Sequence, residues 1–120
     1  GFVVVVEKGG ATTTVETAVD QKQEYVYCMY MDVRWDPRKA VANFRKHQVR
    51  FSDAETVLWD PQGLTVEDDD ARGEQRLITV GCDAVGRVLV VAVTIRGGEI
   101  RLISARKATR KERQAYEEGS

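Results

Sequence analysis

Residues 88–105 read VLVVAVTIRGGEIRLISA, two β-rich runs joined by a pair of glycines. A glycine pair between two such runs is a strong hairpin signal, because the central residues of tight hairpin turns often take positive φ. A two-residue turn pairs Thr94 with Arg101, and residues that oppose each other across the pair share a face. One predicted face is apolar and has to be covered by helices: Val91, Val93, Ile95, Ile100, Leu102 and Ser104. The opposite face is polar near the turn: Ala92, Thr94, Arg96, Glu99, Arg101 and Ile103.

A helix with a clear start precedes these strands. Asp36 is a residue type that caps helices, and Pro37 fits the first helical position, where its missing N–H costs nothing. Val41 and Phe44 predict the buried edge of this helix, with Ala40 beside them. The remaining face is a polar stripe that is basic: Lys39, Asn43, Lys46 and Arg50.

Two capping boxes predict further helix starts. Ser52–Glu55 reads SDAE and opens a second, short helix with Ala54, Val57 and Leu58 directed inward. Thr109–Glu112 reads TRKE and opens a final helix.

The remaining strands are predicted at residues 64–66 and 76–81, separated by an acidic loop over residues 67–74. With the hairpin, the element order is β-α-α-β-β-β-β-α. This order predicts an α+β fold, in which an antiparallel sheet of four or slightly more strands has two helices before it and one after it.

Residues 1–30 are a β-rich segment: FVVVVEK, a Gly9-Gly10 turn, ATTTVET and EYVYCMY. Because Met31 opens a pattern that is self-sufficient, we expect residues 1–30 to be an extension or a misplaced start, and residues 31–120 to be the domain. The competing interpretation is a genuine extra hairpin that pairs with the sheet.

Composition excludes several classes of protein. The longest apolar run, Val88–Val93, is far shorter than the ~20 residues that span a bilayer. Cys28, Cys82 and His47 are too few and too dispersed for structural zinc, so no metal and no cofactor are expected. Two isolated cysteines and the absence of a basic leader favour a cytoplasmic protein.

The basic residues are concentrated near the end of the chain. The net charge is −1, yet residues 96–113 hold seven lysines and arginines against Glu99 and Glu112. Arg101 on the polar face has two interpretations, a solvated side chain paired with an acid, or a clamp for phosphate oxygens. In the second, Arg106, Arg110 and the N–H groups that open the last helix would add to the clamp.

The chain resembles the BrnT family of type II toxins over roughly residues 31–118. The resemblance rests on W-D-x-x-K-x-x-x-N-x-x-K-H-x-V-x-F from Trp35 to Phe51 and on I-S-A-R-x-A-T-x-x-E from Ile103 to Glu112. Three positions depart from the family pattern: Gln48 in place of the usual glycine, and Val93 and Ile95 in place of an aromatic or histidine and an acidic residue.

The resemblance implies a RelE-like fold and a metal-independent endoribonuclease that inhibits translation and growth. It also implies a cognate, BrnA-like, DNA-binding antitoxin that neutralises the toxin, with operator DNA bound only through their complex and no membrane partner. The alternative is a decayed, non-catalytic module that holds an antitoxin and contributes to operator binding; Val93 and Ile95 favour it slightly.

Cleavage of RNA by attack of a 2′-OH on the neighbouring phosphate requires stabilisation of phosphoryl charge, a base and an acid. We predict that Arg101 and Arg76 contact the phosphoryl oxygens, with Arg106 the next candidate. His47 is the leading acid or base because it titrates near neutral pH, and Glu74 is a second candidate base. Predicted contacts to the RNA backbone come from four further basic residues: Lys39, Lys46, Arg96 and Arg110.

Overall fold

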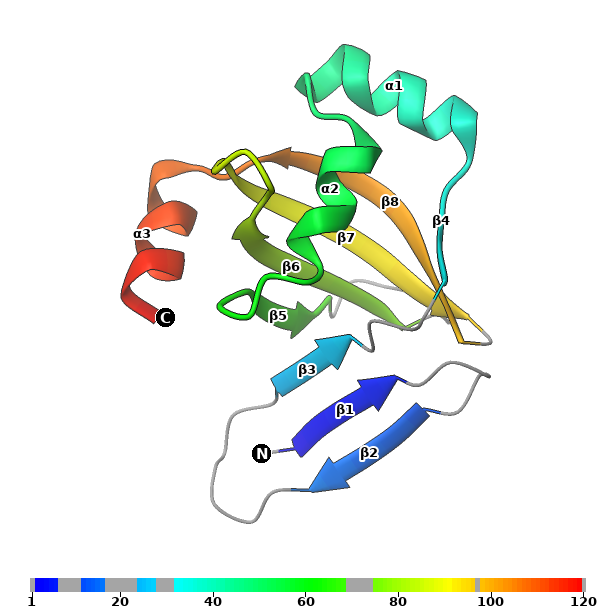
Figure 1. The fold of residues 1–120 in the computed structure, drawn as a ribbon, viewed down its shortest axis with the longest axis vertical. Helices are drawn as coiled ribbons and strands as arrows, with labels where there is room; N and C mark the ends of the chain where they lie inside the picture. Colours follow the sequence, from blue (N-terminus) through cyan, green and yellow to red (C-terminus); the bar gives the residue numbers. More distant parts are fainter. Residues whose placement is uncertain are drawn as a thin grey trace.

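The structure of the protein is a computed structural model that describes residues 32–68, 75–96 and 98–119. Of three strands nearer the start of the chain, and of Gly119, it describes the backbone alone. From residue 32 onward the elements are β4 (Asp32–Arg34), α1 (Pro37–His47), α2 (Phe51–Val57), β5 (Leu64–Glu67), β6 (Arg76–Cys82), β7 (Val88–Arg96), β8 (Glu99–Lys107) and α3 (Arg110–Gly119) (Figure 1). This order confirms the predicted α+β pattern.

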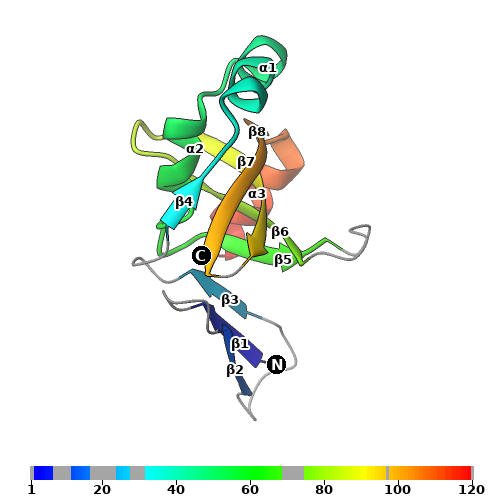
Figure 2. The same ribbon diagram turned by 90° about the vertical axis from the view of Figure 1, so that its right-hand side faces the viewer.

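The main sheet has five strands in the order β4-β8-β7-β6-β5. All neighbours are antiparallel except β4 and β8, which run parallel, with Arg34 beside Arg101. Figure 2 shows α2 and α3 on opposite sides of this sheet. The parallel pair was not predicted, because a strand of three residues carries almost no periodicity and its partner lies 67 positions further along the chain.

The predicted hairpin register is confirmed near the turn and wrong beyond it. Thr94 lies opposite Arg101 and Val93 opposite Leu102, as expected. A β-bulge then places an extra residue on β8, so that Ala92 pairs with Ser104. Ser104 therefore leaves the predicted apolar face, and Ala105, which is fully buried, takes its place opposite Val91.

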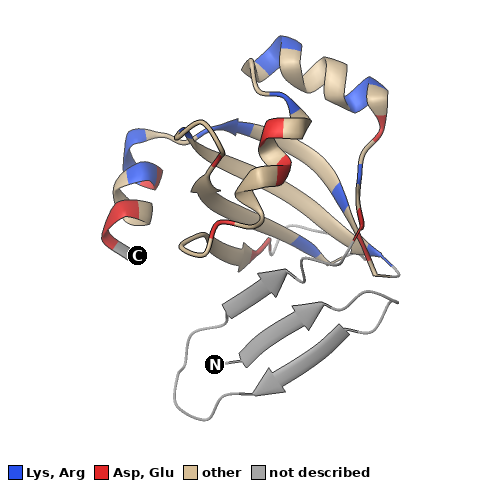
Figure 3. Cartoon of the chain, viewed as in Figure 1, with Lys and Arg blue, Asp and Glu red and all other residues tan. Residues whose placement is uncertain are grey.

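Helix α1 is capped as predicted but rotated relative to the prediction. Asp36 accepts a hydrogen bond from the backbone N–H of Arg38 at 2.8 Å. Val41 and Phe44, predicted to be buried, are 52% and 39% exposed, whereas Asn43, predicted on the polar stripe, is only 7% exposed. The other members of that stripe are exposed, and Figure 3 shows α1 carrying basic residues and no acidic one.

The rotation of α1 has a specific cause. The side-chain amide of Asn43 donates to the carbonyl oxygens of Val49 at 3.0 Å and Ala105 at 2.8 Å, and its oxygen accepts from the N–H of Ala105 at 3.0 Å. Three hydrogen bonds to buried backbone fix which side of the helix faces β8, and they outweigh the modest gain from burying Val41.

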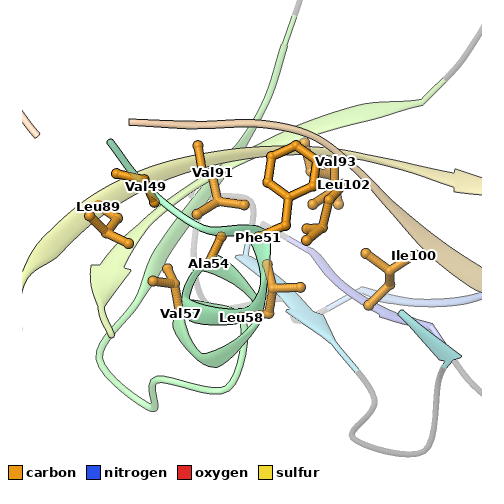
Figure 4. Close-up of a cluster of buried hydrophobic side chains, with 12 residues drawn as sticks. Val49, Phe51, Ala54, Val57, Leu58, Leu89, Val91, Val93, Ile100 and Leu102 are labelled. Carbon is orange, nitrogen blue, oxygen red and sulfur yellow. The ribbon is translucent and has the colours of Figure 1, made fainter. Parts of the chain in front are cut away.

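The hydrophobic core lies between α2 and the sheet (Figure 4). Its buried members come from α2, the flanking loop and the inner faces of the strands: Val49, Phe51, Ala54, Val57, Leu58, Leu77, Leu89, Val91, Val93, Ile100, Leu102 and Ala105. Trp35 packs edge-on against Phe51, with ring centroids 6.0 Å apart. The inward direction predicted for Ala54, Val57 and Leu58 is thus confirmed.

One of the two predicted capping boxes forms. In α3, Thr109 donates its backbone N–H to Glu112 at 2.8 Å, and the N–H of Glu112 donates to the Thr109 hydroxyl at 3.2 Å. In α2 the prediction is wrong: the helix begins at Phe51, with Arg50 at the cap position and no side-chain cap. Starting two residues earlier than the capping box predicts brings the buried Phe51 ring into the helix that covers the core.

Strands β1 (Phe2–Val6), β2 (Thr12–Glu16) and β3 (Glu24–Tyr27) agree with the β-rich interpretation of the first 30 residues. They form a sheet of their own, in the order β2-β1-β3, and not a hairpin added to the main sheet. The predicted Gly9-Gly10 turn lies outside the described residues, and the domain division after residue 30 stays a prediction.

Candidate functional site

Four residues form a row across one face of the main sheet. Arg34 on β4 lies beside Arg101 on β8, Arg101 lies opposite Thr94 on β7, and Thr94 lies opposite Arg76 on β6. Because laterally paired residues share a face, all four side chains leave the same side of the sheet. We call Arg34, Arg101, Thr94 and Arg76 the arginine row; it lies on the face opposite the α2 core.

The arginines of the row differ in how their charge is compensated. The Arg34 Nε lies 3.1 Å from a carboxylate oxygen of Glu99. Arg76 lies 3.7 Å from Asp68, and its Nε is buried without a hydrogen-bond partner among the described residues. Arg101 is exposed and forms no ion pair within the described part of the chain. Arg101 is therefore the member best able to take an external anion.

An open hollow of about 320 Å³ lies at the Arg101 end of the row. Val33, Arg34, Trp35 and Arg101 line it. Two guanidinium groups at one hollow are suited to a nucleotide, because bases stack on guanidinium planes and phosphate oxygens accept from arginine.

The structure does not bring His47 to the row. Helix α1 begins next to β4 and runs along β8, and its Asn43 is bonded to Ala105. Ala105 lies four residues from Arg101, about 13 Å along an extended strand, and His47 is one helical turn beyond Asn43. His47 is half-buried at the end of α1, and its catalytic role stays a prediction.

Arg106 is engaged in a structural contact. Its guanidinium donates two hydrogen bonds to the carboxylate of Glu112, at 2.7 and 2.8 Å. The hydrogen bonds from Arg106 lower the pKa of Glu112 to about 2, and the same contact raises the pKa of Arg106. This pair joins the end of β8 to the first turn of α3, so it is well explained by stability alone.

The other predicted residues are scattered. Lys39 and Lys46 are exposed on α1, and Arg110 is exposed at the start of α3. Arg96 is exposed beside the row, opposite Glu99 at the end of the hairpin. Glu74 lies outside the described residues. Of the predicted site residues, the structure thus brings Arg101 and Arg76 onto one face of the sheet and places Arg96 near them. The other described candidates lie elsewhere.

Two residues of the site were missed as candidates. Arg34 and Trp35 reach the hollow because β4 adds to β8 in parallel, a long-range pairing with no local sequence signal. The only sequence feature that could have indicated them is Arg34 itself, a basic residue directly before Trp35, where the family pattern begins.

The departures from the family pattern lie away from the row. Val93 is fully buried in the core, and Ile95 packs against that core. Neither side chain is on the arginine face. Gln48 adopts φ 61°, the left-handed conformation at the end of α1 that favours glycine.

The described residues contain no group of three His, Cys, Asp or Glu side chains placed to hold a metal ion. In the same part of the chain, none of the helices is both long and apolar enough to cross a membrane.

A second hydrogen-bonded cluster lies at the opposite end of the sheet. Asp60 accepts from the backbone N–H of Cys82 at 2.8 Å and from the Tyr116 hydroxyl at 2.5 Å. Burial and the Asp60 contact raise the pKa of Tyr116 to about 12. For Asp60, burial raises the pKa, but the hydrogen bonds outweigh it and the pKa is lowered. The cluster attaches α3 to β6.

Comparison with known proteins gives a consistent result. The family model for the ribonuclease toxin BrnT of type II toxin–antitoxin systems matches residues 35–112. The crystal structure of the Brucella abortus ribonuclease toxin BrnT is similar, with a TM-score of 0.53 and 25% identity, over 67% of this chain and 99% of that one. No protein of curated function matches.

Proposed function

Because the chain belongs to the BrnT family of ribonuclease toxins from type II toxin–antitoxin systems, we propose that it is an endoribonuclease that cleaves RNA at the arginine row. Membership of such a family implies a cognate antitoxin as partner. The observation that carries the proposal is the exposed guanidinium of Arg101, which forms no ion pair with the residues that the structure describes and is held on a strand beside an open hollow.

The reaction is attack of a ribose 2′-OH on the adjacent phosphorus: a base takes the 2′-OH proton, the bond from phosphorus to the 5′-oxygen breaks, the 5′-oxygen leaves with a proton from an acid or from water, and a 2′,3′-cyclic phosphate remains. Negative charge builds on the non-bridging oxygens, and fixed donors aimed at that charge lower the barrier. Arg101 and Arg76 lie on either side of the buried Thr94 and supply these donors. Strand residues are held more rigidly than loop residues, which suits this role. The nucleophile is the substrate's own 2′-OH, so this chemistry needs no metal to activate a water molecule.

For the base, the remaining candidate is Glu74, which is proposed only on its position in the sequence, two residues before Arg76. The separation of His47 from Arg101 argues against His47 as the group that takes the 2′-OH proton. Lys39, Lys46, Arg96 and Arg110 bind phosphates of the RNA outside the cleaved bond, and Arg106 acts by positioning α3.

At the level of the cell, the proposed toxin acts in the cytoplasm, where it inhibits translation and growth. A BrnA-like antitoxin with a DNA-binding part neutralises it, and operator DNA is contacted through the complex of the two proteins.

Expression in bacteria that lack the antitoxin tests the function. Growth arrest by the wild type, relieved by Arg101→Ala and by Arg76→Ala, supports catalysis at the row. Arg113→Ala is the matched control, because Arg113 is an exposed arginine of α3 outside the site. It should arrest growth as the wild type does. Harmless expression of the wild type, with accumulation of the folded protein verified, counts against the proposal.

One observation favours the non-catalytic alternative. Among the described residues the arginine row contains no histidine, and the nearest carboxylates, Asp68 and Glu99, are paired with Arg76 and Arg34. If the protein only holds an antitoxin, Arg101→Ala and Glu74→Gln weaken that complex without any change in RNA.

A further inference from the structure

The outer face of α1 combines exposed apolar side chains with arginine. Val41 and Phe44, three residues apart, are 52% and 39% exposed. Arg38 and Arg45 lie three residues before and four residues after Val41, so all four side chains are neighbours on the helix surface. The guanidinium carbon of Arg50 lies 5.4 Å from the centroid of the Phe44 ring. We call Arg38, Val41, Phe44, Arg45 and Arg50 the outer face of α1.

The charge of this helix is not compensated. Residues 37–47 contain arginine and lysine but no acidic residue. The basic side chains of α1 and Arg50 form no ion pair with any described residue. Elsewhere in the described chain several arginines do pair with carboxylates: Arg34, Arg76, Arg87 and Arg106. The positive charge of α1 is therefore available to a partner.

We propose that the outer face of α1 binds an acidic amphipathic helix of a protein partner. Exposed Val41 and Phe44 match leucine-type anchors at i, i+3 and i+7 spacing, and the surrounding guanidinium groups match carboxylates on the flanks of such a helix. RNA is the weaker occupant, because an aliphatic valine at the centre of the face offers nothing to a phosphate backbone. This inference rests on the proposed function in one respect: the toxin family implies that the antitoxin supplies the helix.

Peptide binding tests the surface without requiring nuclease activity. The probe is a fluorescein-labelled helical peptide of about 18 residues, rich in glutamate, with leucines spaced i, i+3, i+7. Fluorescence anisotropy should show binding to the whole chain that weakens as salt is added. Val41→Glu should weaken it at least tenfold, because a carboxylate then faces the carboxylates and leucines of the peptide. Val85→Glu is the matched control, since Val85 is 72% exposed in the β6–β7 turn and lies outside the face; binding should stay within twofold of wild type.

Three results would overturn the inference. They are absence of binding to the wild type, equal binding by Val41→Glu, and equal binding of a peptide whose leucines are replaced by serine. Displacement of the peptide by a single-stranded RNA, with Val41→Glu weakening RNA and peptide alike, would assign the face to RNA.

The same variants separate this inference from the proposed function. If Arg101→Ala leaves RNA cleavage intact, the catalytic proposal fails while peptide binding is untouched. If Val41→Glu toxin is neutralised by the co-expressed antitoxin as well as Val85→Glu toxin is, the outer face of α1 is not the antitoxin surface, whatever the status of the arginine row.

Discussion

Replacing Asn43 with alanine should destabilise the protein by about 3–5 kcal/mol. The side chain makes three hydrogen bonds of 2.8–3.0 Å at a position that is 7% exposed. Each such bond contributes about 1 kcal/mol net, and each buried group that loses its partner costs about 1–3 kcal/mol. The carbonyl oxygens of Val49 and Ala105 and the N–H of Ala105 would all lose the Asn43 contact. The lower limit of the estimate is the net free energy of three hydrogen bonds. The upper part of the range allows for buried groups that water rehydrates only partly after the side chain is removed.

Urea unfolding followed by circular dichroism measures this directly, as the difference in free energy of unfolding between wild type and variant. Asn43→Asp refines the test, because it keeps the shape and the acceptor of the side chain but removes both donors. Its free energy of unfolding should fall by most of the amount lost in Asn43→Ala. Gln48→Ala is the control: this amide also lies at the end of α1, but it makes one exposed hydrogen bond to Arg45 at 3.1 Å, and its loss should cost under about 0.5 kcal/mol.

A loss below about 1 kcal/mol for Asn43→Ala would refute the reasoning. It would mean that the amide does not determine the rotation of α1, and the exposure of Val41 and Phe44 would need another explanation.

Three further predictions concern the ends of α1 and α3. Gln48→Gly should stabilise the protein by about 0.5–1 kcal/mol in urea unfolding, because it relieves a side chain held at φ 61°. Glu112→Gln should reduce the free energy of unfolding at neutral pH by about 1–2 kcal/mol. Because the pKa of Glu112 is about 2 in the folded protein, its contribution to stability is present above about pH 4.5 and is lost as the pH falls toward 2. The stability of the variant should therefore depend less on pH in this range. Tyr116→Phe should cost about 1 kcal/mol and remove stability that the wild type loses between about pH 10 and pH 12, because the pKa raised to about 12 favours the neutral hydroxyl bonded to Asp60.

Local sequence signals predicted the parts of the fold that short-range chemistry determines. The Gly97-Gly98 pair identified the hairpin, Asp36 and Pro37 identified the start of α1, and Thr109–Glu112 formed the reciprocal cap of α3. Each of these features is completed by residues within a few positions of one another.

The predictions were wrong where contacts between residues far apart in the sequence determine the structure. The polar residue type of Asn43 predicts a position on the solvent side, yet its partner Ala105 is 62 positions away. The β-bulge moved Ser104 to the opposite face, and no local signal marked the extra residue. The pairing of β4 with β8, which brings Arg34 to Arg101, likewise depends on the assembled sheet.

For the candidate site, hairpin register predicted the face that carries Arg101. The place of Arg76 on the same face depends on the pairing of β6 with β7, which was not predicted, and neither the acid nor the base could be predicted. His47 is predicted as acid or base from its residue type, since imidazole is the side chain suited to proton transfer near neutral pH, but residue type does not determine position in the fold. Val93 and Ile95 suggested a loss of function in the sequence pattern, but their core position leaves the arginine row unchanged.

The most direct test is cleavage of a short RNA by the purified whole chain in EDTA. The account predicts products ending in 2′,3′-cyclic phosphate, no cleavage at a position carrying a single 2′-deoxyribose, and a kcat/KM about 10²–10³-fold lower for Arg101→Ala but unchanged for Arg113→Ala. Cleavage by Arg101→Ala at the wild-type rate, or loss of activity that metal addition restores, would contradict it.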